Sequence, residues 1–159
     1  MRKARCNKNV IVNPDMKYNN VQIQKLINCI MREGKKTIAE KICYGALEKA
    51  AEEVNMSVND FFNKIITSVQ PNKYTVSKRF GGNTYDIPKE VPEHKKPLRA
   101  IHIISNVLKD EIRSQGKCAI DVLTNLFIQT YNGIGKLIEK KDALHKKADA
   151  NAAFSHFGW

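Results

Sequence analysis

Lysine and arginine side chains gather in groups along this sequence, and such groups could bind the phosphates of a polyanion. The chain has 27 basic and 16 acidic residues among 159, a formal net charge of +11. A cation placed beside a nucleic-acid phosphate releases condensed counterions, so the groups together favour polyanion binding over a merely soluble basic protein. They are Arg2, Lys3, Arg5, Lys8 and Lys17; Lys35 and Lys36; Lys78 and Arg79; Lys95, Lys96 and Arg99; and Lys136, Lys140, Lys141, Lys146 and Lys147.

A second set of residues with binding chemistry lies at the end of the chain. Aromatic faces can stack on unpaired bases at roughly 1–3 kcal/mol each, and Asn and His offer polar contacts to sugar or base edges. The aromatic residues could instead pack the chain end onto the folded domain, and the sequence leaves both interpretations open. The set comprises Asn151, Phe154, His156, Phe157 and Trp159.

The sequence has no local motif for catalysis or metal binding. Its histidines and cysteines lack metal-ligand spacing, and the pair Gly81 and Gly82 lacks the strand-to-helix context of a phosphate-binding loop. We therefore predict a non-enzymatic protein with no metal and no cofactor. No stretch has the ~20 apolar residues of a membrane span, so we expect no membrane partner. The histidines and cysteines are His94, His102, His145, His156, Cys6, Cys29, Cys43 and Cys118.

Two helices are predicted in the first third of the chain, after a basic N-terminal arm that we expect to be extended over residues 1–18. Apolar residues at helical spacing run from Ile23 to Ile30, and this helix is expected to end near Gly34. Thr37 and Glu40 form a capping-box pattern that would open a second helix.

A third helix is predicted next, and after it the spacing of apolar residues changes from helical to strand-like. Ser57 and Asp60 suggest a cap, and Pro71 would close the helix. From there β-prone residues alternate on both sides of Gly81 and Gly82, which predicts a β-hairpin arm over residues 73–91. We expect its loop to be longer than a two-residue turn. A lone two-stranded ribbon is marginal in water, so it must lean on the helices or on a ligand.

Helical spacing returns after Pro97 and predicts three more helices, the last of them rich in lysine. Asn132 and Gly133 are interpreted as a helix terminator and loop between the fifth and the sixth helix. The predicted fold is mainly α: one domain over residues 1–159, a six-helix bundle with a protruding two-stranded β-hairpin arm. A basic N-terminal extension precedes it, and a basic C-terminal helix and tail occupy residues 136–159.

Three segments, in this order, resemble ribosomal protein seven of the small subunit, of the bacterial or organellar type. Residues 34–47 are similar to the family's GKKS-x-AE segment, residues 77–91 to its SRRVGG ribbon, and residues 140–159 to its KK…H…AFAHYRW ending. The resemblance covers almost the whole chain. The sequence departs from the family's usual residues at Lys78, Phe80, Asp86, His102, Ile103 and Gly158.

The resemblance implies a structural constituent of the small ribosomal subunit that binds the three-prime domain of its rRNA and nucleates assembly of the head. The protein would be a monomer that contacts neighbouring proteins, including ribosomal protein eleven, and would line the mRNA exit channel near the exit-site tRNA. The expected rRNA contacts are Arg2, Lys3, Arg5, Lys8, Lys35, Lys36, Lys78, Arg79, Lys95, Lys96, Arg99, Lys140, Lys141, His145, Lys146, Asn151, His156 and Trp159. The residues expected near tRNA or mRNA are Lys78, Arg79, Gly81, Gly82, Asn83 and Tyr85.

Two other function classes compete with this interpretation. A DNA-bending architectural protein could also insert basic β-arms into a minor groove, and it would be a dimer with paired arms. An enzyme with catalytic residues far apart in sequence would have a substrate pocket. The excess of Lys over Arg and the frequent Ile and Asn indicate an AT-rich coding sequence. We therefore expect a ribosome of the bacterial cytoplasm or of an organelle.

Overall fold

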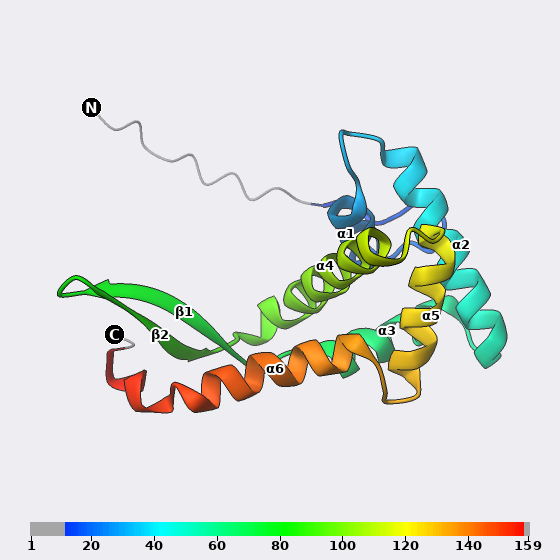
Figure 1. Ribbon diagram of the computed structural model, residues 1–159. Helices are drawn as coiled ribbons and strands as arrows, with labels where there is room; N and C mark the ends of the chain where they lie inside the picture. Colours follow the sequence, from blue (N-terminus) through cyan, green and yellow to red (C-terminus); the bar gives the residue numbers. More distant parts are fainter. Residues whose placement is uncertain (1–11, 158–159) are drawn as a thin grey trace.

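The computed structural model describes residues 12–157, apart from the side chains of residues 115, 156 and 157. A helical body lies at one end of the molecule and a β-hairpin projects from it beside the last helix (Figure 1). This confirms the predicted mainly helical fold with a hairpin arm. The elements are α1 (Val21–Ile30), α2 (Lys36–Val54), α3 (Val58–Val69), β1 (Lys73–Phe80), β2 (Asn83–Glu90), η1 (Glu93–Lys95), α4 (Lys96–Gln115), α5 (Ala119–Tyr131), α6 (Lys136–Ala150) and η2 (Ala152–Phe157), where η marks a 3-10 helix.

The ends of the first two helices differ from the prediction. α1 ends at Ile30, because Met31 leaves the helical region of backbone space with a ψ of 135°, three residues before Gly34. α2 begins at Lys36 after Lys35, which makes no side-chain cap. Thr37 therefore already lies inside the helix, and the capping box predicted from it is wrong.

The cap predicted for the third helix is confirmed. The Ser57 side-chain oxygen accepts a hydrogen bond from the backbone N–H of Asp60 at 3.2 Å, which satisfies one of the free donors at the start of α3. The hydroxyl in turn donates to the Asp60 carboxylate at 2.7 Å. The Asp60 carboxylate also lies in the first turn of the helix, where negative charge is favourable.

The hairpin turn is shorter than predicted. Phe80 and Asn83 are partners in the antiparallel register, so Gly81 and Gly82 alone form the turn. Both glycines have positive φ, 53° and 92°. A two-residue turn with positive φ at both positions matches the right-handed twist of the flanking strands and is open to glycine without strain. The expectation of a longer loop is therefore wrong.

Aromatic side chains join α3 and α5 at the centre of the helical body. The ring of Phe127 lies edge-on to Phe61 and Phe62, with centroids 6.4 and 6.5 Å apart. All three side chains have no exposed surface. Aliphatic residues of α1, α2 and α4, and Leu137 of α6, belong to the same cluster, which brings helices α1 to α6 around one core.

A buried carboxylate fixes the start of the described chain. The Asp15 carboxylate accepts hydrogen bonds from the backbone N–H groups of Tyr18 and Asn20 at 2.9 and 2.8 Å, and from the Tyr44 hydroxyl at 3.3 Å. Burial, and then the nearby Asp15 charge, raise the pKa of Tyr44 to about 12. Residues 16–18 form a turn, so this part of the predicted arm is not extended; residues 1–11 lie outside the described residues.

None of the helices in the described part of the chain is both long enough and apolar enough to span a membrane.

Replacing Phe127 with Ala should lower the free energy of unfolding by about 3–5 kcal/mol, because it leaves a cavity among the packed rings. Urea denaturation followed by circular dichroism measures this. The control is Ile134→Ala: the Ile134 side chain is 71% exposed, and its loss should change stability by less than about 0.5 kcal/mol. Equal effects of the two substitutions would contradict the placement of the core.

Candidate nucleic-acid interface

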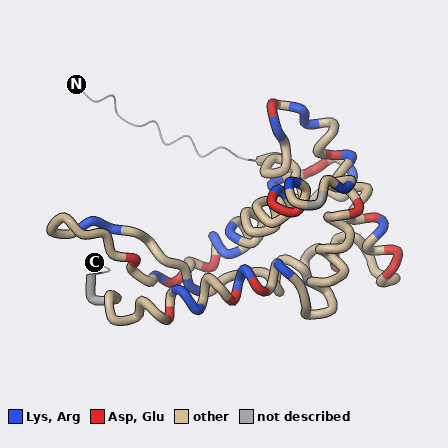
Figure 2. The backbone as a smooth tube through the Cα atoms, viewed as in Figure 1, with Lys and Arg blue, Asp and Glu red and all other residues tan. Residues whose placement is uncertain are grey.

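Basic residues lie along the projecting half of the molecule and on the helical body, rather than on one face of one helix (Figure 2). The projecting half consists of β1, β2, the later turns of α6 and η2, which lie side by side in Figure 1. The basic groups thus lie on several elements. Such a layout can follow an irregular phosphate backbone.

Contacts between the hairpin and α6, which we call the hairpin clasp, hold the projecting half together. Lys73 of β1 pairs with Asp149 at 2.9 Å, and Asp86 of β2 pairs with Lys147 at 2.7 Å. Hydrogen bonds from Lys147 and then from Ser77 hold the pKa of the Asp86 carboxyl below its ordinary value. The hydrogen bond to Asp149 raises the pKa of Lys73.

Two residues predicted as nucleic-acid contacts belong to this clasp. The backbone N–H of Asn72 donates to Nε2 of His145 at 3.0 Å, which joins the start of the hairpin to α6. Tyr85 packs against Phe154 of η2, with ring centroids 5.2 Å apart. The packing interpretation of Phe154 is therefore confirmed, although its partner is the hairpin and not the helical bundle.

The entry to α4 lies against the base of the hairpin. The Arg99 guanidinium is 4.6 Å from the ring centroid of Tyr74 on β1, a cation–π contact. Lys96 pairs with Glu93 at 2.5 Å and is only 18% exposed, whereas Lys95 is exposed. The structure thus brings Arg99 together with the hairpin, which the sequence could show only as two separate basic groups.

The remaining predicted basic residues of the described chain differ in whether their side chains already have a partner within the protein. Lys35 pairs with Glu33 at 2.7 Å, and Lys36 pairs with Glu40 at 3.7 Å. The Lys141 ammonium donates to the Ser68 carbonyl at 2.9 Å, and the Asn151 amide donates to the Lys147 carbonyl at 2.9 Å. Lys140 and Lys146 are exposed.

Several predicted contacts cannot be placed. Arg2, Lys3, Arg5, Lys8 and Trp159 lie outside the described residues, and so does the side chain of His156.

Arg32 and Lys109 were not among the contacts predicted from the sequence. Arg32 follows α1 and Lys109 lies on α4, and both line one hollow together with Lys35. Only their proximity in the fold marks them as a group.

Within residues 12–157, no cluster of three or more His, Cys, Asp or Glu side chains could hold a metal ion. The Cys43 thiol is buried, and burial raises its pKa, so it is a core residue and not a reactive nucleophile.

Comparisons with known proteins all match the same family of ribosomal proteins. A family model described as ribosomal protein S7p/S5e matches residues 1–152. Small ribosomal subunit protein uS7 of Ehrlichia ruminantium (strain Gardel) is 40% identical over 156 residues, which cover 98% of this chain and 97% of that protein. Protein uS7B of Aquifex aeolicus (strain VF5) is 40% identical over 147 residues, 92% of each chain. Protein uS7 of Petrotoga mobilis (strain DSM 10674 / SJ95) is 37% identical over 159 residues, the full length of both.

The hairpin clasp should depend on pH through Asp86. A carboxyl whose pKa is lowered by folding stabilises the fold above its ordinary pKa, and this contribution is lost as the pH falls through the lowered value. Lys147→Gln should move the Asp86 titration, followed by carboxyl NMR, up towards the ordinary value. The control Lys49→Gln removes an exposed partner of Asp121 and should leave that titration unchanged. An unshifted Asp86 titration in Lys147→Gln would show that the clasp pair is not formed.

Proposed function

The chain belongs to the S7p/S5e family of ribosomal proteins, and on that premise we propose that it binds the three-prime domain of small-subunit rRNA and nucleates assembly of the head. Membership of the family makes it a structural constituent of the small ribosomal subunit and confirms the prediction that it is not an enzyme. The matched relatives named above are bacterial, which supports a bacterial ribosome and gives the organellar alternative no support.

Exposed cations on the projecting half and at the entry to α4 carry the rRNA proposal. Among the described residues, Arg79, Lys95, Lys140 and Lys146 are exposed and have no ion-pair partner within 4.0 Å. They lie on three different elements, so their charges spread over a long, uneven surface. Such a surface suits a folded RNA, whereas a DNA-reading protein usually concentrates its contacts on one recognition element.

The hairpin turn suits an approach to tRNA and mRNA at the exit site. Gly81 and Gly82 are exposed, and a Cβ added to either would meet nothing within 4 Å. The turn is therefore open to a ligand on its outer side. Arg79 and Asn83 are exposed beside it, whereas Tyr85 is partly covered by Phe154. We assign the tip contacts to Arg79 and the turn, and propose that ribosomal protein eleven is a neighbour there.

Binding to the three-prime rRNA domain, compared with equal-length duplex DNA across a salt series, tests the proposal. We expect binding to the RNA to persist at salt concentrations that release the DNA, because shape recognition adds to counterion release. Equal and steeply salt-sensitive binding to both would leave only a generic polyanion binder. Failure to bind the RNA at all would overturn the proposal outright.

Matched variants locate the contacts. The double variant Lys140→Gln/Lys146→Gln should reduce the slope of log affinity against log salt by roughly 0.7–0.9 for each phosphate that the variant no longer neutralises. Lys49→Gln is the control: Lys49 is exposed as well, but it lies on α2, away from the projecting half, and pairs with Asp121 at 3.0 Å. An unchanged slope in the double variant would remove α6 from the proposed interface.

A further inference from the structure

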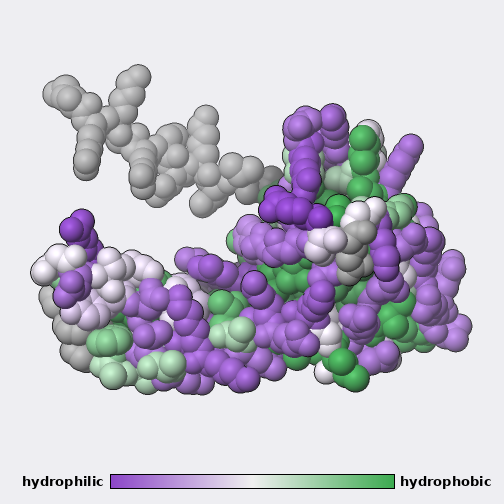
Figure 3. Space-filling view, viewed as in Figure 1, coloured by the Kyte–Doolittle hydropathy of each residue, from purple (hydrophilic) through white to green (hydrophobic). Residues whose placement is uncertain are grey.

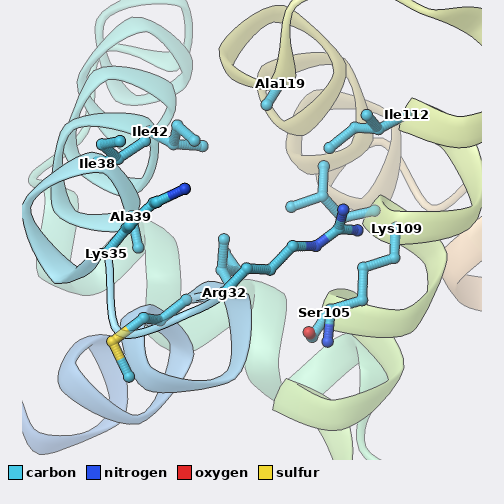
Figure 4. A pocket seen from close by; sticks show the side chains of 12 residues that line it. Arg32, Lys35, Ile38, Ala39, Ile42, Ser105, Lys109, Ile112 and Ala119 are labelled. Atoms are coloured by element: carbon cyan, nitrogen blue, oxygen red, sulfur yellow. The ribbon is translucent and has the colours of Figure 1, made fainter.

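A hollow of about 180 Å³ opens between the start of α2, the later turns of α4 and the first residue of α5. Figure 4 shows side chains of α2 and of α4 facing each other across it, with Arg32 reaching between them. The hollow lies on the helical body and away from the hairpin clasp. None of the basic groups assigned above to the projecting half lines it.

Aliphatic side chains form the walls of the hollow. Ile38 and Ile42 come from α2, and Leu108 and Ile112 from α4. Ile38 is 54% exposed, so its side chain is accessible to a ligand in the hollow. Over the end of the body where α1 and α2 meet, hydrophobic surface lies directly beside hydrophilic surface (Figure 3).

The walls offer little hydrogen bonding. The Ser105 hydroxyl, which also lines the hollow, already donates to the Cys29 carbonyl at 2.9 Å. A ligand in the hollow would therefore be held by apolar contact and not by a specific pattern of donors and acceptors.

Cations surround this apolar surface. Arg32, Lys35 and Lys109 line the hollow. Lys35 pairs only with the exposed Glu33, and exposed pairs are weak and exchangeable. The described residues supply no ion-pair partner for Arg32 or Lys109 within 4.0 Å. The occupant must then combine an apolar face with negative charges on its flanks.

We propose that one unpaired nucleobase of the bound rRNA inserts into this hollow, with its flanking phosphates on Arg32, Lys35 and Lys109. The inference rests on the proposed rRNA binding. A splayed nucleotide presents an apolar base face between two phosphates, which matches aliphatic walls between cations. Because the aliphatic walls carry no donor or acceptor and the cations are assigned to the phosphates, the hollow selects an unpaired base by its accessibility and accepts any of the four bases.

The chain's own N-terminal segment fits the hollow poorly as an occupant. Residues 1–11 contain Arg2, Lys3, Arg5 and Lys8 and no acidic residue, so cations around the hollow would repel them. An acidic, apolar peptide of a partner protein is the remaining occupant class, and crosslinking separates it from RNA.

Site-specific photocrosslinking tests the proposal. A photoreactive side chain replaces Ile38 in the full chain, which is then bound to the three-prime rRNA domain and also assembled into small subunits. We expect a crosslink to a single unpaired nucleotide in both. A crosslink to a protein in the subunit, or none in either sample, would overturn the inference. Ile134, which is 71% exposed and lies between α5 and α6, takes the same side chain as the control for random contact.

Two variants complete the test. Ala119→Phe fills the hollow from the α5 side, and Arg32→Gln/Lys109→Gln removes two of its cations. Each should weaken binding to the rRNA domain at least about fivefold and restore reactivity of that nucleotide to base-modifying reagents. Normal protection in Ala119→Phe would overturn base insertion. If the wild-type chain fails to bind the rRNA, the proposed function fails; if it binds while the Ile38 crosslink stays at the control level, only this inference fails.

Discussion

A two-stranded hairpin is marginal in water on its own, and this constraint governs the projecting half of the molecule. Among the described residues, β1 and β2 pair only with each other, so their support comes from side chains of α6, η2 and the start of α4. Ile87 on β2 has no exposed surface, and Ala148 on α6 is 1% exposed. The ion pairs of the clasp are largely exposed, and exposed ion pairs contribute little to stability. Apolar burial thus supplies the stability, and the polar contacts fix which residues face each other.

Three lysines of the predicted basic groups form ion pairs that are local and reversible. Lys35, Lys36 and Lys96 each pair with a glutamate no more than four residues away. An exposed pair of this kind is weak and is screened by salt, so a phosphate can replace the carboxylate at little cost. Under the rRNA binding proposed above, the glutamates would hold the ammonium groups near their binding positions before RNA binds. Lys96 is the most enclosed of the three and is the one least free to turn towards a ligand.

Sequence patterns predicted the elements well because helical and strand periods depend on local burial, which each segment carries in its own residues. They failed where several local solutions compete: the cap predicted at Thr37 gave way to a helix whose cap residue, Lys35, lies two residues earlier. For the candidate interface, the sequence predicted groups of basic residues but not which groups lie side by side in the fold. The His145 ring accepts a hydrogen bond from the backbone at the base of the hairpin, from a residue 73 positions earlier in the chain. No local pattern encodes this contact. Arg32 and Lys109 become neighbours of one hollow only after α1 and α4 have packed together.

The residues that meet in the hairpin clasp are far apart in the sequence, and this affects when the hairpin can dock during synthesis of the chain. Asn72 and Lys73 contact α6 residues 73 and 76 positions later in the chain. A ribosome adds residues from the N-terminus, so the hairpin sequence leaves the exit tunnel well before its support exists. The helical body can form most of its core from α1 to α5 in that interval. The hairpin of a nascent chain must therefore wait for residues 136–157, which form α6 and η2, before the arm can gain its docked form.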